Sequence, residues 1–143
     1  MTYDASRAMN GSWGQLWEDS REIAEVSAFQ CKLNKNYETV AQCGTMMEDR
    51  KLVSCTGTGS MTISKVFTRC DSEVDQVLQG HDIRRSLVGA LRDPDAFGAE
   101  RVALYGVSYD ELALMDWESK KVGTVTVPFA FTGIKYLDKV EVQ

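Results

Sequence analysis

The one histidine, His81, and the cysteines are the side chains best suited to catalysis or metal binding. A single histidine excludes multi-histidine metal sites and the H-E-x-x-H motif. The cysteines are spaced 12, 12 and 15 residues apart, so no C-x-x-C pair of a zinc or redox motif exists: Cys31, Cys43, Cys55 and Cys70. No third residue orients His81 towards Cys70 as a nucleophile and its base would require. We expect no catalytic residue, no metal site and no enzyme.

Three other patterns resemble binding motifs and fail at particular positions. Residues 57–59 read Gly-Thr-Gly, but no G-x-x-x-x-G-K-[ST] loop occurs, and the pattern favours a strand with close backbone approach. Residues 93–98 begin like a calcium loop, but Phe97 and Leu104 occupy positions that require oxygen ligands, which favours a turn. Four carboxylates could flank a sugar, but a solvated turn is the favoured interpretation: Asp110, Glu111, Asp116 and Glu118. We therefore expect no cofactor.

Composition indicates one soluble domain over residues 1–143. The chain has 143 residues, 43% of them hydrophobic, with 16 basic and 21 acidic side chains and a net charge of -5. No run of Lys or Arg exceeds two residues, which argues against sequence-specific nucleic-acid binding. No apolar stretch approaches the roughly 20 residues of a membrane span. Without a signal-peptide pattern we expect reduced thiols, although the cysteines would allow a secreted scaffold with two disulfides.

These residues must be positioned mainly by strands. Alternating polar and apolar residues predict strands at 13–17, 23–29, 53–67, 82–91, 100–109 and 122–131, with extended chain at 37–42. A helix is expected from Asp71 to Gly80, with an apolar stripe of Val74, Val77 and Leu78. Pro128 cannot donate to a sheet ladder, so its end of the last strand is expected at an edge or bulge.

The strand at 53–67 has two chemically different faces. One face is apolar or small: Cys55, Gly57, Gly59, Met61 and Ile63. The other carries only hydroxyls: Thr56, Thr58, Ser60, Thr62 and Ser64. Such a long strand with one wet face is typical of a barrel or of a sheet built between chains.

Several short motifs together resemble the tail tube proteins of contractile, myovirus-type phages and of phage-derived bacteriocin particles of Gram-positive bacteria. Residues 93–101 resemble the D-P-D-x-[FY]-G-A-E-R block of that family, and residues 127–132 resemble its A-P-F-x-F-T block. The other matches, in chain order, lie at 10–17, 56–60, 108–112, 116–118 and 137–138. At 56–60 threonines replace both lysines of the family's K-G-K-G-S strand, which leaves any carried-over lumen charge open.

The resemblance implies an antiparallel β-sandwich or half-barrel with one flanking helix. Six copies would form a ring with a continuous inner barrel, and rings would stack into a tube inside a sheath. The implied partners are further copies of the chain, the tail sheath protein, the baseplate and tail terminator proteins, and a tape measure protein in the lumen. DNA would pass without specific binding, and the tail would assemble in the cytoplasm of the host bacterium.

Two segments are the expected contacts between copies. They are an N-terminal arm, residues 1–10, and an extended inter-ring loop, residues 43–52. The candidate contact residues are Tyr3, Arg7, Asn10, Cys43, Gly44, Thr45, Met46, Met47, Glu48 and Asp49. The hydroxyl face from Thr56 to Ser64 is the candidate lumen lining, with the outside of the ring as the competing location.

A monomeric β-barrel that binds a small ligand or carbohydrate is the alternative from another functional class. It would require a concave apolar pocket, with Trp13, Trp17 or Trp117 as the obvious contacts.

Overall fold

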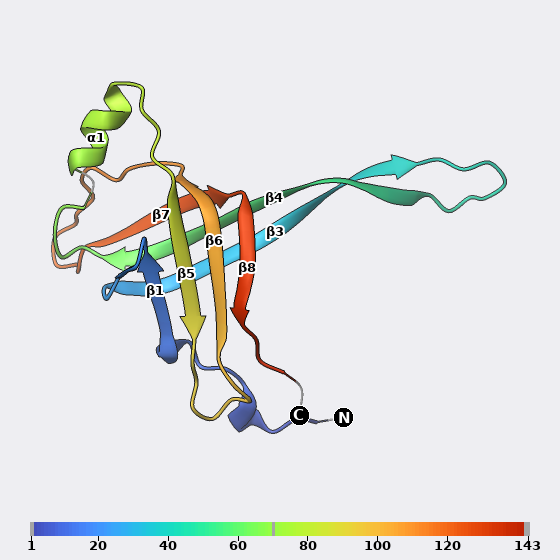
Figure 1. Cartoon of the computed structure of the whole chain (residues 1–143), viewed down its shortest axis with the longest axis horizontal. Coiled ribbons are helices and arrows are strands. Elements are labelled where there is room, and N and C mark those ends of the chain that lie inside the picture. Colours follow the sequence, from blue (N-terminus) through green and yellow to red (C-terminus); the bar gives the residue numbers. More distant parts are fainter. Residues whose placement is uncertain (1, 70, 142–143) are drawn as a thin grey trace.

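The computed structural model describes residues 2–69 and 71–141, which form eight strands, one α-helix and two short 3-10 helices (Figure 1). The 3-10 helices are Ala5–Arg7 and Gly11–Trp13. The strands are β1 (Gly14–Glu18), β2 (Arg21–Glu22), β3 (Val26–Val40), β4 (Asp49–Ser64), β5 (Arg85–Leu91), β6 (Glu100–Tyr109), β7 (Thr124–Phe131) and β8 (Gly133–Asp138), and the helix is α1 (Asp71–Leu78). In this part of the chain no helix is long and apolar enough to cross a membrane.

Two groups of antiparallel strands meet at β6. The strand order is β2-β1-β5-β6-β7-β4-β3, and β8 also pairs with β6. The beginning of β6 pairs with β8, whereas only Ser108 and Tyr109 at its end pair with β7. In Figure 1, β3, β4 and β7 cross steeply behind β5, β6 and β8. The described sheet does not close on itself, and the predicted antiparallel β architecture with one helix is confirmed.

β6 changes partner at Gly106. This glycine has φ +64°, a conformation that side chains disfavour, and a Cβ added there would lie 2.3 Å from the hydroxyl oxygen of Thr132. The Thr132 amide, in the corner between β7 and β8, donates to the Tyr105 carbonyl at 3.1 Å. Gly106 therefore lets β6 bend beside the corner that separates its two partners.

The core lies where the two groups of strands cross. It contains Leu16, Ile23, Met61, Ile63, Leu87, Leu104, Val107, Phe129 and Phe131. The Phe29 and Phe129 rings stack with centroids 5.8 Å apart. A Cβ on Gly59 would lie 2.3 Å from the Gln30 carbonyl oxygen and 2.6 Å from the Phe129 ring. The Gly-Thr-Gly pattern is thus a strand site of close backbone approach, as predicted.

β3 and β4 form a hairpin much longer than this core. Their ladder runs from Val26 opposite Ile63 to Val40 opposite Asp49. β7 covers β4 only from Gly57 to Ser64, and the rest of the hairpin projects away from the other strands (Figure 1). We call residues 26–32 with 57–64 the proximal half of the hairpin, and residues 33–56 the distal half.

The strand predictions succeed where alternation is strong. β6 has the predicted bounds, and β7 and β5 begin two and three residues later than expected. The predicted strand at 23–29 and the predicted extended chain at 37–42 are largely parts of one strand, β3. The predicted loop at 43–52 is shorter than expected, because residues 49–52 belong to β4 and pair with β3. β8 was not predicted. β7 lies between β6 and β4, but its ladder with β6 contains only Phe129 and Ala130. Pro128 accepts from the Asp110 amide at 2.9 Å, so its missing donor lies where the ladder with β6 ends.

The helix is confirmed, and its predicted apolar stripe is largely exposed instead of packed on the core. α1 begins at Asp71, and Gly80 follows it with φ +87°, the left-handed conformation of a helix stop. Val77 and Leu78 are 48% and 80% exposed, whereas Glu73 is 7% exposed. Glu73 faces inwards because Arg85 of β5 binds it. Cys70 lies outside the described residues.

Candidate assembly surfaces

The hydroxyl face of β4 points away from the core. Across the hairpin, the Asn34 side-chain amide donates to the Thr58 hydroxyl at 2.9 Å, and the Thr62 hydroxyl lies 3.4 Å from that of Thr126 on β7. Met61 and Ile63, on the opposite face, are buried in the core. The alternation predicted for this strand is therefore correct, and hydroxyl and amide groups extend from β4 onto both neighbouring strands.

The tip of the hairpin contains most of the loop candidates. Met46 and Met47 are 98% and 80% exposed, and the Thr45 hydroxyl accepts from the Met47 amide at 3.2 Å. Gly44 has φ +86°, which fits the reversal of the chain between β3 and β4. Cys43 is an exposed free thiol, and Glu48 precedes Asp49, the first residue of β4. The structure thus gathers Cys43 to Asp49 at one projecting end.

The sequence reasoning missed an apolar face on the distal half of the hairpin. Leu33, Leu52 and Val53 are about half exposed and Tyr37 is 36% exposed. Leu33 continues the core-facing side of β3, and Tyr37 pairs with Leu52 beyond a bulge. The cationic groups of Lys35 and Arg50 lie 5.6 and 3.9 Å from the centre of the Tyr37 ring, which puts them on the same side. We call these six residues the distal face. Alternation of Leu33, Lys35 and Tyr37 with Asn34 and Asn36 was the signal available.

The N-terminal arm folds back on its own chain. The Arg7 guanidinium donates to the Asp95 carbonyl at 2.9 Å and lies 4.9 Å from the centre of the Phe97 ring. The Asn10 amide donates to a carboxylate oxygen of Asp93 at 2.8 Å. Asp93 also accepts from the Asp95 amide, which confirms 93–98 as a turn. Arg7 and Asn10 therefore have partners within the chain, while Tyr3 is 81% exposed.

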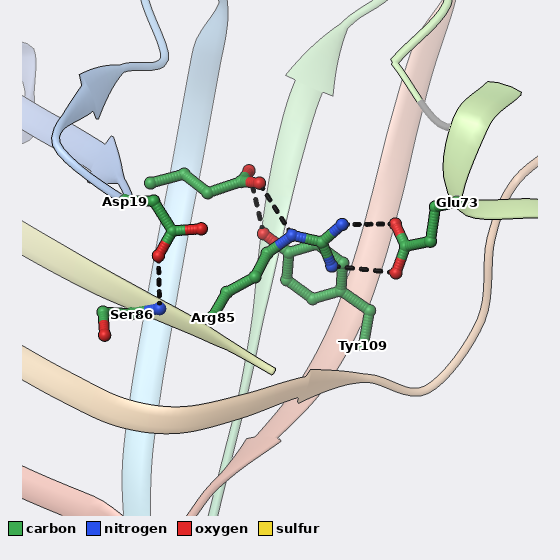
Figure 2. A network of polar contacts seen from close by, with 6 residues as sticks. Asp19, Glu73, Arg85, Ser86 and Tyr109 are labelled. Atoms are coloured by element: carbon green, nitrogen blue, oxygen red, sulfur yellow. Dashed lines mark hydrogen bonds and ion pairs between the residues drawn. The ribbon is translucent and has the colours of Figure 1, made fainter. Parts of the chain in front are cut away.

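A buried ion cluster fixes α1 to the sheet (Figure 2). Two guanidinium nitrogens of Arg85 donate to the two carboxylate oxygens of Glu73, at 2.9 and 2.5 Å. Its third nitrogen lies 2.8 Å from Glu18 on β1, and the Tyr109 hydroxyl donates to the same carboxylate at 3.0 Å. Nearby, an Asp19 oxygen accepts from the Ser86 amide at 2.9 Å. One arginine thus connects α1, β1, β5 and β6.

The cluster changes the pKa of two of its members. Burial acts to lower the pKa of Arg85, but the hydrogen bonds that Arg85 donates to Glu73 and the negative charge of Glu18 outweigh it and raise that pKa. Burial, followed by the negative charge of Glu18, raises the pKa of Tyr109 far above its usual range. Arg85 stays charged and Tyr109 neutral at physiological pH. These protonation states suit residues that hold α1 against the sheet and do not suit proton transfer.

The remaining chemical candidates are dispersed. His81 is exposed and follows α1 in the chain, and its backbone amide donates to the Gln76 carbonyl. Burial raises the pKa of the Cys31 thiol, with a smaller contribution from Glu100, and Cys55 is exposed. Within residues 2–69 and 71–141, no three His, Cys, Asp or Glu side chains are grouped as metal ligands.

One cavity of about 720 Å³ lies between α1, the turn from β1 to β2, and the segment 111–114. Core residues such as Ile63 and Val127 form its apolar part, and Glu18, Glu73 and Arg85 form a charged part. The tryptophans considered for a binding module, Trp13, Trp17 and Trp117, are not among its lining residues. A second pocket of about 580 Å³, between β1, β3 and β5, is not lined by these tryptophans either.

Comparison with known proteins gives the same architecture. The phage-like element PBSX protein XkdM of Bacillus subtilis (strain 168) is 31% identical over 98% of this chain and 97% of its own length. A structure of the sheath-tube complex of an extracellular contractile injection system, PVC, in the extended state matches with a TM-score of 0.67 at 5% identity, covering 94% of this chain and 98% of the other. The C6-symmetric tail of an empty gene transfer agent particle matches with a TM-score of 0.54 at 15% identity, covering 92% and 100%.

The family model described as "Phage tail tube protein" matches residues 1–138, which include the hydroxyl face, the projecting hairpin and the ion cluster. With a model match over nearly the whole chain and a relative above 30% identity, the chain belongs to the phage tail tube protein family.

Proposed function

We propose that this chain forms hexameric rings that stack into the inner tube of a contractile phage tail or of a related particle such as an R-type bacteriocin. The proposal is supported by the sheath-tube complex and the C6-symmetric tail among the structural matches. It makes the protein a structural conduit through the cell envelope and not an enzyme.

The observation that carries the proposal is the open sheet. Among the described strands, β3 has no partner on its outer side along Val26–Val40, and β8 has none opposite β6. Long unpaired edges favour pairing with another chain. In a closed ring each edge meets the edge of the next copy, so the same groups that would cause aggregation become the joints of an inner barrel.

The hydroxyl face of β4 is the proposed lumen lining. Thr56, Thr58, Ser60, Thr62 and Ser64 present neutral groups, and six copies at a net charge of -5 each give a formal ring charge of -30. Because bound phosphates would hold DNA through salt-dependent contacts, a neutral or acidic wall lets it pass. A tape measure protein would occupy the same bore before ejection.

The other partners would contact the outside and ends of the tube. We assign the sheath protein to the outer wall, the baseplate to one end and the tail terminator to the other, with assembly in the host cytoplasm. Contacts between copies would use Tyr3 and the tip from Cys43 to Asp49, which are free to reach a neighbour. Arg7 and Asn10 would act indirectly, by holding the arm against the turn at 93–98.

Electron microscopy combined with site-directed labelling tests the proposal. The purified chain, examined by negative stain over a concentration series and with a baseplate seed, is expected to give rings and tubes with a central hole. Thr58→Cys should react with a bulky maleimide in the dispersed chain and be protected inside long tubes, whereas Lys139→Cys, at an exposed position after the end of β8, serves as the comparison site. A monomer that never enters seeded tubes would contradict the tube and favour the monomeric binding module. Full labelling of Thr58→Cys in intact tubes would contradict only the lumen assignment.

A further inference from the structure

Two exposed apolar surfaces lie at opposite ends of this molecule. One is the distal face of the hairpin, and the other surrounds α1 (Figure 1). We define the α1 surface as α1 together with residues 110–118. Val77, Leu78, Leu114, Met115 and Trp117 belong to it, and the last four are between 71% and 80% exposed. Large exposed apolar patches are typical of surfaces that another protein covers.

The two surfaces also differ in charge. The distal face carries the cations Lys35 and Arg50. The acidic residues of the hairpin strands, such as Glu38, lie on the opposite face of the ladder. The α1 surface carries seven acidic residues and no basic one: Asp71, Glu73, Asp75, Asp110, Glu111, Asp116 and Glu118. Glu73 is occupied by Arg85 and Glu118 by Lys121, which leaves five carboxylates to attract a cationic partner.

The α1 surface is built to keep its shape. The bidentate contact of Arg85 with Glu73 fixes α1 over the cavity, whose wall includes Val74 of α1 and Leu112 and Leu114 of the following segment. The cavity continues inwards to Met61 and Ile63 of the core. A receiving surface that is fixed in advance loses little conformational entropy when it is covered.

We propose that the distal face of one copy covers the α1 surface of a neighbouring copy. The occupant is a second copy because one chain carries both halves, apolar against apolar and cationic against acidic, at ends that cannot meet within the molecule. Such a contact joins two different patches, so each added copy offers a new receiving surface and the contact propagates. The inference rests on the proposed tube, for which it names the receiving surface of the hairpin.

Cross-linking between separately mutated chains tests this contact. Chains carrying Leu52→Cys are mixed with chains carrying Leu114→Cys, assembled, and treated with a short bis-maleimide. Because the two new thiols are on different chains, a peptide linking positions 52 and 114 in mass spectra reports only a contact between copies. The parent chain and each single variant alone show what the four native cysteines contribute. Leu52→Cys mixed with Lys139→Cys is the matched control, since Lys139 is exposed after the end of β8, outside both surfaces and outside the free strand edges.

A charge substitution gives an independent readout. Leu114 is 71% exposed, so Leu114→Asp should leave unfolding unchanged while raising the concentration needed for tubes at least tenfold. Lys139→Asp, at an exposed position outside both surfaces, should have no comparable effect.

The two hypotheses fail differently. If the parent forms tubes, but positions 52 and 114 do not cross-link and Leu114→Asp assembles normally, the contact is wrong and the tube stands. Links to position 139 would place the hairpin near the end of β8, and coverage of the α1 surface by sheath protein would also overturn the inference. A parent chain that forms no tubes, even when seeded, contradicts the proposed function and with it this contact.

Discussion

The proximal and distal halves of the β3–β4 hairpin share one continuous ladder but differ in what covers their side chains. In the proximal half, Phe29 stacks on Phe129, and Met61 is 2% exposed. In the distal half, Leu33 and Leu52 face the same side of the ladder and remain 53% and 46% exposed. Backbone hydrogen bonds run through both halves, so the difference lies in burial alone.

This difference separates folding from assembly along a single pair of strands. Isolated two-stranded hairpins are marginally stable in water, and the distal half has no third strand against it. Its apolar side chains therefore contribute little to the fold of one chain and remain available to another copy. The proximal residues should control unfolding, and the distal residues should control assembly.

The largest contrast is expected from truncating Phe129 of β7, which packs on Phe29 of the proximal half, and Tyr37, which lies in the distal half. Phe129→Ala removes a ring that is 1% exposed and should lower the free energy of unfolding by about 3–5 kcal/mol. Tyr37→Ala removes a side chain that is 36% exposed and should change the free energy of unfolding by less than about 1 kcal/mol. Urea unfolding of the dispersed chain, at concentrations below assembly, measures both. Equal losses would show that the distal half is stabilised within the chain and would remove the distinction.

The next contrast comes from enlarging the side chain at two positions on the same face of β4. Gly59→Val forces atoms against the Gln30 carbonyl and the Phe129 ring and should cost about 3 kcal/mol of unfolding free energy. Cys55→Val, on the same face beyond the cover of β7, should stay within about 0.5 kcal/mol of the parent. Thermal and urea unfolding provide the comparison, and a well-tolerated Gly59→Val would mean that the two strands can separate locally without loss.

Charge placed on the distal half should affect assembly and spare folding. Leu52→Asp should raise the concentration required for tubes about tenfold, equivalent to about 1.4 kcal/mol per contact, with urea unfolding unchanged. Ser54→Asp introduces the same charge at an exposed position on the opposite face and is the control. Light scattering with microscopy gives the threshold for each. Equal effects of the two variants would indicate a general charge effect and no preferred face.

The smallest effect concerns alkaline pH and the buried phenol beside the proximal half. Because the pKa of Tyr109 is raised by folding, its neutral form is favoured in the native state, and stability from this group is complete below the ordinary tyrosine pKa of about 10. Stability should then decline as pH rises above that value, because the unfolded state loses its proton first. Melting temperatures from pH 8 to 11 should fall less steeply for Tyr109→Phe than for the parent. Tyr37→Phe, in the distal half, should follow the parent curve.

The sequence predicted those strands that are determined by the alternation of their own residues. The alternation in β6 predicted its observed bounds, and in the strand predicted at 122–131 the alternate residues Phe129 and Phe131 are buried. β8 was missed because Ile134 and Tyr136 stay exposed, and the strand exists through its pairing with β6. Residues 30–36 are too polar to indicate a strand alone, yet their partners on β4 hold them in one.

Of the candidate surfaces, too, only those determined by the pattern within one segment could be predicted. The hydroxyl face followed from period-two alternation within one strand. The inward position of Glu73 did not, because it depends on Arg85, which is twelve residues away and on another element. The distal face was missed because a bulge between Asn36 and Tyr37 shifts the register that brings Tyr37 opposite Leu52. Both failures come from contacts that no single segment of the sequence contains.

The bend of β6 at Gly106 has a geometric consequence for any closed assembly. The dihedral angles of that glycine help to set the angle between the two groups of strands, and the Thr132 hydroxyl leaves no room for a Cβ. In a ring of identical copies, a fixed angle within each copy adds up around the circumference, so it determines how wide the circle is when it closes. The bore of the tube would then depend in part on the curvature that one glycine permits in one strand.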